Sequence, residues 1–147
     1  MTTIVTTALI RRPVDAVFAY VTTPAHWLAW HPSSLGLHGA TDHSLTIGEE
    51  VTEEFRVAGR KGSVTWRVIA RDAPKLWAIS GKVAGGGDGT ITYTLSADGG
   101  ETTFRREFVY SMPNWFAGLL DHLFVRRRIE AESAEAVRRL KQALEAS

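Results

Sequence analysis

Two residues of opposite charge interrupt alternating apolar patterns, and they are the strongest candidates for ligand chemistry in the sequence. Glu53 has the parity of Val51, and Arg106 has the parity of Phe104 and Phe108. Alternate residues of a β-strand share one face, so both charges are predicted on the apolar face of a sheet. An unpaired charge there costs on the order of several kcal/mol, so each must meet an opposite charge, a polar ligand group or water.

The functional interpretation of Arg106 is a charged hydrogen bond to a ligand that carries a carboxylate or an enolate. It predicts that Arg106→Leu weakens the binding of such a ligand while the fold stays intact. Two structural interpretations compete with it. A β-bulge near Arg105 and Arg106 would turn the arginine outward, and a purely structural ion pair would neutralise it.

Three further polar residues could take part in acid–base chemistry. His31 follows Trp30 at the end of a predicted short helix, where the chain turns back toward the sheet. We expect Trp30 to be at least partly buried and His31 to face a cavity or its mouth. Convergence of His31, Glu53, Tyr93 or Tyr110 on one point, with a perturbed pKa, would distinguish an enzyme from a binding protein.

Several other chemistries lack their signatures. The chain has no cysteine, which excludes disulfides, thiolate nucleophiles and sulfur-ligated zinc. His26, His31, His38 and His43 have no acidic or histidine companions at useful spacing, so neither a metal nor a cofactor is predicted. The glycine-rich run 85–89 lacks the lysine and the helix of a phosphate loop and indicates a hairpin connection. No Gly-x-Ser-x-Gly elbow positions a serine nucleophile.

A cluster of arginines at 126–128 lies in the predicted C-terminal helix. Glu130 and Glu132 follow at helical spacing, which is typical of a solvated helix face with ion pairs. The alternative is contact with an anionic ligand or a membrane surface at a cavity mouth.

Length and composition indicate one globular domain over residues 1–147. Apolar residues make up 44% and charged residues 22% of 147 residues, and the formal net charge is +1. This charge gives no field to gather nucleic acid, and no apolar run approaches the roughly 20 residues that span a bilayer. The N-terminus lacks the pattern of a signal peptide, so a cytoplasmic protein is expected. The expected assembly is a monomer or a homodimer.

Periodicity divides the chain into a strand at 3–10, helices at 13–21 and 24–30, about six strands within 35–110, and a long helix from about 113 to 146. Short turn-rich connections, including one at Thr41 and Asp42, favour an antiparallel meander. The apolar side of the long helix is predicted to include Leu120, Leu123, Ala134, Val137, Leu140 and Leu144. In the strand after residue 62, one alternating set is predicted to face the helix: Val64, Trp66, Val68 and Ala70. The other set is predicted to face away: Thr65, Arg67 and Arg71.

The predicted fold class is therefore α+β, with a seven-stranded curved antiparallel sheet gripping a long C-terminal helix and two short helices after the first strand. This order, together with the segments 10–21, 24–30 and 140–145, resembles the helix-grip superfamily (SRPBCC), which includes START domains, pollen-allergen-like proteins and polyketide cyclases/dehydrases. The resemblance implies a deep cavity between sheet and helix. Members of the superfamily use that cavity for lipid or hormone binding, for transport, or for ring closure of polyketide-like substrates.

The expected function is binding of an apolar or amphipathic small molecule in this cavity. An enzyme of the cyclase or dehydratase kind is the alternative, and an interaction module whose aromatic side chains fill the cavity is a third. The predicted ligand-binding residues are Trp30, His31, Glu53, Phe55, Trp66, Trp77, Tyr93, Arg106, Phe108, Tyr110, Phe116 and Leu120.

Overall fold

The computed structural model describes residues 1–57, 59–111 and 122–146, with no side-chain description for 122–124. An N-terminal strand, β1 (Thr2–Ile10), is followed by α1 (Val14–Val21), a 3₁₀ turn η1 (Pro24–His26) and α2 (Trp27–Trp30). The remaining strands are β2 (Ser34–Gly39), β3 (Glu50–Val57), β4 (Arg60–Asp72), β5 (Leu76–Val83), β6 (Asp88–Asp98) and β7 (Glu101–Ser111). The last described element is α3 (His122–Glu145).

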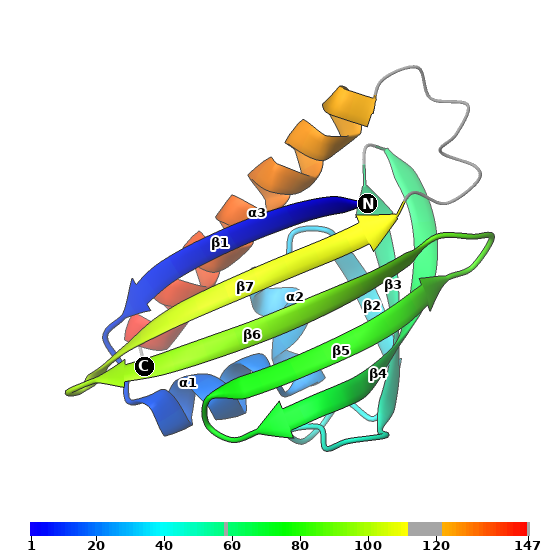
Figure 1. Cartoon of the computed structure of the whole chain (residues 1–147). Coiled ribbons are helices and arrows are strands. Elements are labelled where there is room, and N and C mark those ends of the chain that lie inside the picture. The colour runs from blue at the N-terminus through cyan, green and yellow to red at the C-terminus, as the bar shows by residue number, and fades with distance from the viewer. Residues whose placement is uncertain (58, 112–121, 147) are drawn as a thin grey trace.

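The strands form a seven-stranded antiparallel sheet in the order β1-β7-β6-β5-β4-β3-β2. Each strand from β2 to β7 pairs with its neighbour in sequence, and β1 closes the order by pairing with β7. Figure 1 shows the sheet curving around α3, with α1 and α2 on the same side. The predicted meander, the long C-terminal helix and the short helices after the first strand are confirmed.

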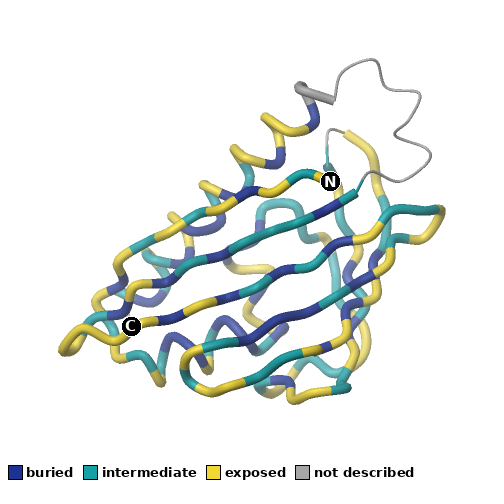
Figure 2. The backbone as a smooth tube through the Cα atoms, in the orientation of Figure 1, coloured by how far each residue is buried: buried dark blue, intermediate teal, exposed yellow. Residues whose placement is uncertain are grey.

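Burial follows the alternation that a one-sided sheet requires, as Figure 2 shows along the central strands. The concave face of β6 buries Gly89, Ile91, Tyr93 and Leu95, whereas the alternate threonines lie outside. The α1 helix begins after Pro13 and buries Val17, Phe18 and Val21 against this face. Its predicted bounds were correct to within one residue.

Strand β4 departs from simple alternation. The register of the β4–β5 pair shifts between Val68 and Ala70, so that Arg71 lies opposite the buried Trp77. Arg71 Nη1 donates hydrogen bonds to Ser44 Oγ at 2.8 Å and to the Leu45 carbonyl at 2.9 Å. The prediction that Arg71 faces away from the helices, with Ala70 facing them, is therefore wrong, because one extra residue in a bulge reverses the parity of all that follow.

The connection between β2 and β3, residues 40–49, is longer than the turn predicted at Thr41 and Asp42. Its anchor is Leu45, which is fully buried. The Leu45 amide donates to the Thr22 carbonyl at 3.1 Å, and the Leu45 carbonyl accepts the Trp77 indole N–H at 3.0 Å. This segment thus covers the end of the sheet at which Trp77 of β5 lies, and it joins that end to the C-terminus of α1.

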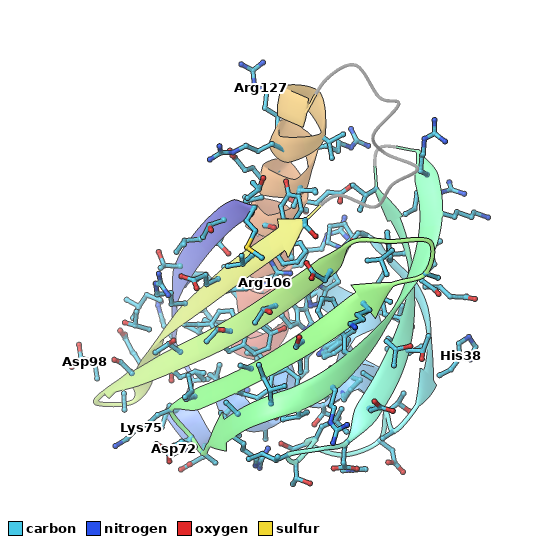
Figure 3. The ribbon with its side chains drawn as sticks, turned by 45° about the vertical axis from the view of Figure 1, so that its right-hand side comes forward. His38, Asp72, Lys75, Asp98, Arg106 and Arg127 are labelled. Atoms are coloured by element: carbon cyan, nitrogen blue, oxygen red, sulfur yellow. The ribbon has the colours of Figure 1, made fainter. Side chains whose placement is uncertain are left out.

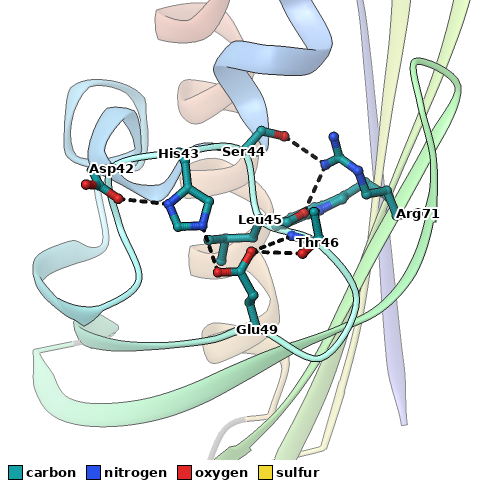
Figure 4. Close-up of polar contacts among 8 residues, drawn as sticks. Asp42, His43, Ser44, Leu45, Thr46, Glu49 and Arg71 are labelled. Carbon is teal, nitrogen blue, oxygen red and sulfur yellow. Dashed lines mark hydrogen bonds and ion pairs between the residues drawn. The ribbon is translucent and has the colours of Figure 1, made fainter.

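On the outer side of the same connection, His43 bonds to a carboxylate through each ring nitrogen (Figure 4). The Nδ1 atom lies 2.8 Å from Asp42 Oδ1, and Nε2 lies 2.7 Å from Glu49 Oε2. These hydrogen bonds, that to Asp42 first, raise the pKa of His43. Sequence spacing did not reveal this pairing, because folding of the connection brings Glu49 back to His43.

The described part of α3 presents an amphipathic pattern. Its buried positions are Val125, Ile129, Ser133, Ala136, Val137, Leu140 and Leu144. Ala134 is exposed, so its assignment to the apolar side is wrong by one position; the buried neighbour is Ser133. The predicted solvated arginine face is confirmed, since Arg126 pairs with Glu130 at 2.8 Å and Arg128 with Glu132 at 3.6 Å. The predicted start of the helix near residue 113 lies outside the described residues.

Candidate functional site

An aromatic cluster fills one part of the space between the sheet and the helices, at the end where the 40–49 connection contacts Trp77. We call this cluster, formed by Trp27, Trp30, Trp77, Tyr93 and Phe104, the aromatic plug; each member is at most 2% exposed. The Trp77 and Tyr93 rings stack with centroids 5.4 Å apart, and the Tyr93 and Phe104 centroids are 5.1 Å apart. At these separations, aromatic pairs each add about 0.5–1.5 kcal/mol beyond the burial of their area. The plug therefore forms a rigid floor.

Above the plug the same space is hollow, and three glycines on the concave face let neighbouring side chains lie against the sheet there. Gly62, Gly81 and Gly89, the glycine row, lie in neighbouring strands β4, β5 and β6. A Cβ atom at Gly81 would lie 2.7 Å from the Trp66 ring, and one at Gly62 would lie 2.7 Å from Phe55. The glycine row thus lets these rings lie close to the sheet and leaves open space above them.

The resulting cavity measures about 110 Å³, whereas one buried water needs roughly 10–15 Å³. It can therefore hold a small organic molecule. It is lined by Trp27, His31, Ser33, Glu53, Phe55, Val57, Val64, Trp66, Ile79, Val83, Asp88, Gly89, Ile91, Tyr93, Arg106, Phe108, Tyr110, Ser111 and Ile129. Val57, Asp88 and Ser111 retain solvent exposure, whereas the lining residues nearer the plug are buried. Among the described residues, the cavity therefore opens at the end of the sheet that holds the last residues of β3 and β7 and the first residue of β6.

Arg106 projects from β7 into this cavity and is 5% exposed. Its Nη1 donates to Ser133 Oγ of α3 at 3.2 Å, and its guanidinium lies 5.3 Å from the centre of the Phe108 ring. Figure 3 shows Arg106 within the fold, in contrast to Arg127, which points outward from α3. The β6–β7 register is regular through Tyr93 and Arg106, so the outward-turning bulge considered from the sequence is absent from this strand.

The charge of Arg106 has no acidic partner within ion-pair distance among the described side chains. Its Nε is buried without a hydrogen-bond partner there. The sequence also left open a purely structural ion pair for Arg106. The described residues do not form one. An unsatisfied buried donor of this kind is unusual and needs a polar group to face it.

Glu53 enters the cavity from β3 and is 9% exposed. Its Oε1 accepts a hydrogen bond from the Trp66 indole N–H at 3.0 Å. Burial raises the pKa of Glu53, while the hydrogen bond from Trp66, and last the charge of Arg106, act in the opposite direction. Glu53 and Arg106 therefore share one cavity without forming a direct pair.

His31 lies at the end of α2, where its ring packs 3.9 Å from that of Trp30. It lines the cavity as expected, and Trp30 is fully buried, which was also expected. Burial first, and then the charge of Arg106, lower the pKa of His31 well below its ordinary value. The ring is thus neutral at pH 7. Within the described structure its Nε2 is buried without a hydrogen-bond partner.

The two tyrosines behave differently. Burial raises the pKa of Tyr93, with the charge of Arg106 opposing it, so Tyr93 remains a phenol that can donate a hydrogen bond. Burial also raises the pKa of Tyr110, but the groups that influence that pKa besides burial are Thr2, Arg126 and Glu130 and not Arg106. His31, Glu53, Tyr93 and Arg106 therefore form the polar group of the cavity, and the Tyr110 hydroxyl lies apart from it.

The positions of the other predicted residues follow from this arrangement. Phe55, Trp66, Phe108 and Tyr110 line the cavity with the polar group. Trp30 and Trp77 belong to the plug beneath it and are not in the lining. Phe116 and Leu120 lie outside the described residues.

Sequence reasoning missed seven lining residues and Ser133 as the partner of Arg106; the seven are Trp27, Ser33, Val83, Asp88, Gly89, Ser111 and Ile129. The sequence pattern places Gly89 in the hairpin connection 85–89, but it lies in β6. Ile129 and Ser133 follow Val125 at intervals of one helical turn, a signal that the sequence contained. Ser33, Asp88 and Ser111 lie at or beyond strand ends, where alternation gives no signal.

Neither a metal cluster nor a membrane span is found within residues 1–57, 59–111 and 122–146. No set of three histidine or acidic side chains in these ranges is placed to hold a metal ion. No helix in them is both long enough and apolar enough to cross a bilayer.

Comparison with known proteins gives one family over nearly the whole chain. The family model described as "Polyketide cyclase / dehydrase and lipid transport" matches residues 1–145. A curated relative, penitrem biosynthesis cluster 1 protein I from Penicillium ochrochloron, is 32% identical over 62 residues. That stretch is 41% of this chain and 40% of the relative, so the similarity spans less than half of either protein.

Solved structures share the fold at low sequence identity. A conserved protein from Geobacillus kaustophilus matches with a TM-score of 0.80 and 8% identity, covering 99% of this chain and 97% of that one. A protein from Chromobacterium violaceum matches with a TM-score of 0.76 and 15% identity, covering 99% of both chains.

Proposed function

The chain belongs to the polyketide cyclase/dehydrase and lipid transport family, and on that premise we propose that it binds an apolar or amphipathic small molecule in the cavity between the sheet and α3. Ligand sites are typically apolar enclosures with a few convergent polar groups, and this cavity has that composition. The observation that carries the proposal is the presence of unpartnered buried atoms, Arg106 Nε and His31 Nε2, in the described cavity wall. A ligand would satisfy them.

Two kinds of wall would contact such a ligand. Phe55, Trp66 and Phe108 offer flat aromatic surfaces above the glycine row, and the Tyr110 ring extends this wall toward the mouth. The polar group beneath would orient the molecule. Burial of apolar area contributes roughly 25 cal/mol per Å² before the costs of association, so the aromatic wall would supply most of the affinity.

Native mass spectrometry of the protein purified from its own host tests the proposal directly, because a co-purifying mass identifies the ligand class. Titration with an apolar fluorescent probe tests it independently, and we expect saturable binding at a ratio of one probe per chain. Ile129→Trp introduces a bulky ring into the cavity from α3 and should abolish probe binding. Arg127→Trp is the matched control, since Arg127 is exposed and points outward from the same helix. Weak uptake without saturation would argue against a ligand cavity.

A second candidate function, proton-transfer catalysis of the cyclase or dehydratase kind, is favoured by the convergence of the polar group. His31 Nε2 is a neutral, unpartnered base among the described residues, and Arg106 could stabilise an oxyanion that develops beside it. The name of the Penicillium relative, which refers to a biosynthetic cluster, is in keeping with such a role. Deuterium incorporation into a β-ketothioester in D₂O would detect turnover. Equal exchange in the wild type and in a folded His31→Gln variant would exclude this role for His31.

A further inference from the structure

We infer that the ligand is an organic acid, that its anionic group binds Arg106, and that it enters the cavity with this acidic end first. The inference rests on the proposed function and deepens it by naming the class of ligand and its orientation. Three observations lead to it: the unneutralised guanidinium, the state of the other polar groups, and the position of the plug.

The guanidinium of Arg106 has unused capacity for an anion. Ser133 accepts one hydrogen bond from Nη1, and the described Nε has no acceptor. Arginine presents its donors in a planar fork that matches a carboxylate, and a hydrogen bond between ionised groups is about twice as strong as a neutral one. A ligand carboxylate would therefore supply both the missing acceptor and the missing counter-charge.

No other group in the described cavity is placed to supply that counter-charge. Glu53 is engaged by the Trp66 indole, lies beyond ion-pair distance of Arg106, and is driven toward its neutral form by burial. His31 is neutral, and Tyr93 stays protonated. Asp88, at the mouth, bonds to the Ser111 hydroxyl at 2.7 Å. The buried end of the cavity is thus cationic or neutral, which favours an anion.

The direction of entry follows from the position of the plug. Arg106 lies opposite Tyr93, a member of the plug, so the guanidinium is at the floor of the cavity. The walls between this floor and the mouth include the apolar side chains Val57, Phe108 and Ile129. A molecule that pairs with Arg106 must therefore place its acid group at the floor and its apolar body toward the mouth.

A matched pair of probes separates this inference from the proposed function. 2-Naphthoic acid and 2-naphthalenemethanol have similar shapes, but only the first is an anion at pH 7. Isothermal titration calorimetry should show the acid binding at least about tenfold more tightly, as expected for a hydrogen bond between charged groups. Arg106→Leu should remove that preference by weakening the acid alone. Arg105→Leu is the control, because Arg105 is on the opposite face of β7 and pairs with Glu107 at 3.2 Å.

The outcomes are distinct. Equal affinities for acid and alcohol in the wild type would overturn the inference while the proposed function stands. Failure of both probes to bind would overturn both. Arg106→Lys retains a cation and should keep a reduced preference for the acid, which covers the case in which Arg106→Leu fails to fold. Nuclear Overhauser effects should join ring protons remote from the carboxylate to methyl groups of Val57 and Ile129. Contact of those protons with Tyr93 instead would reverse the orientation and refute it.

Discussion

Glu53→Gln offers the most direct test of the electrostatics of the cavity. The substitution removes the charge of a 9% exposed carboxyl but keeps an oxygen that can accept the Trp66 indole N–H. Burial is the largest influence on the pKa of Glu53, and the attraction to Arg106 is the smallest. Loss of the charge should therefore stabilise the folded protein whenever Glu53 of the wild type is ionised.

The sign and the pH window follow from proton linkage. Because the pKa of Glu53 is raised on folding, the folded state holds its proton over a range of pH in which the unfolded state has lost it. The free energy of unfolding of the wild type therefore falls as pH rises from the ordinary glutamate pKa to the raised one, relative to the Gln variant. Above that window the variant should be more stable by about 1–3 kcal/mol, the usual cost of an uncompensated buried polar group.

Urea denaturation of both proteins at pH 4 and pH 8 measures this effect. The two free energies of unfolding should nearly agree at pH 4, and the variant should gain at pH 8. Glu54→Gln is the control, because Glu54 is exposed on the opposite face of β3 and should show no such gain. A Gln variant that is less stable than the wild type at pH 8 would mean that Glu53 is held by an attraction stronger than its burial cost, and would refute this account.

Three other expectations concern the plug and the 40–49 connection. Trp77→Ala should lower the free energy of unfolding, measured by chemical denaturation, by about 3–5 kcal/mol, because it removes a fully buried ring from the plug. A loss below about 1 kcal/mol would contradict the role of the plug as a rigid floor. Arg71→Leu should accelerate hydrogen exchange of the Leu45 amide, because two hydrogen bonds to Ser44 and Leu45 disappear; unchanged exchange would show that Leu45 burial alone holds the connection. His43→Asn should lower the melting temperature at pH 5.5 but not at pH 9. The pKa of His43 is raised in the folded protein, so its interactions with Asp42 and Glu49 stabilise the fold only where the imidazole is protonated. Equal losses at both pH values would exclude the charge as the cause.

The polar residues of the cavity were largely predictable, because parity suffices in regular strands. Glu53 and Arg106 lie in β3 and β7 at positions where the ladder has no irregularity, and both face the helices as the alternation requires. Arg71 was misplaced by the same rule, because a bulge leaves no mark in the pattern of apolar residues. Alternation thus predicts a face only as far as the next irregularity.

The division of the interior into the aromatic plug and the cavity was not predictable from the sequence. Trp66 and Trp77 look alike in an alternating pattern, yet one lines the cavity and the other is packed in the plug. The difference arises across strands: Gly81 lies opposite Trp66, whereas Trp77 lies opposite Tyr93. Such pairings depend on sheet register, which only the folded chain reveals.

The glycine row has a consequence for how this protein could change over evolutionary time or in a laboratory library. The plug retains the tightly packed aromatic core, so specificity can be altered above it without rebuilding the fold. Of the three glycines only Gly89 lines the cavity itself, and the row differs in how much room each position leaves for a side chain. An added methyl would meet Phe108 at 3.1 Å from Gly89 but the Trp66 ring at 2.7 Å from Gly81. Gly89 is therefore the position from which a new ligand preference can be selected in small steps, whereas a side chain at Gly62 or Gly81 would force a neighbouring ring to move.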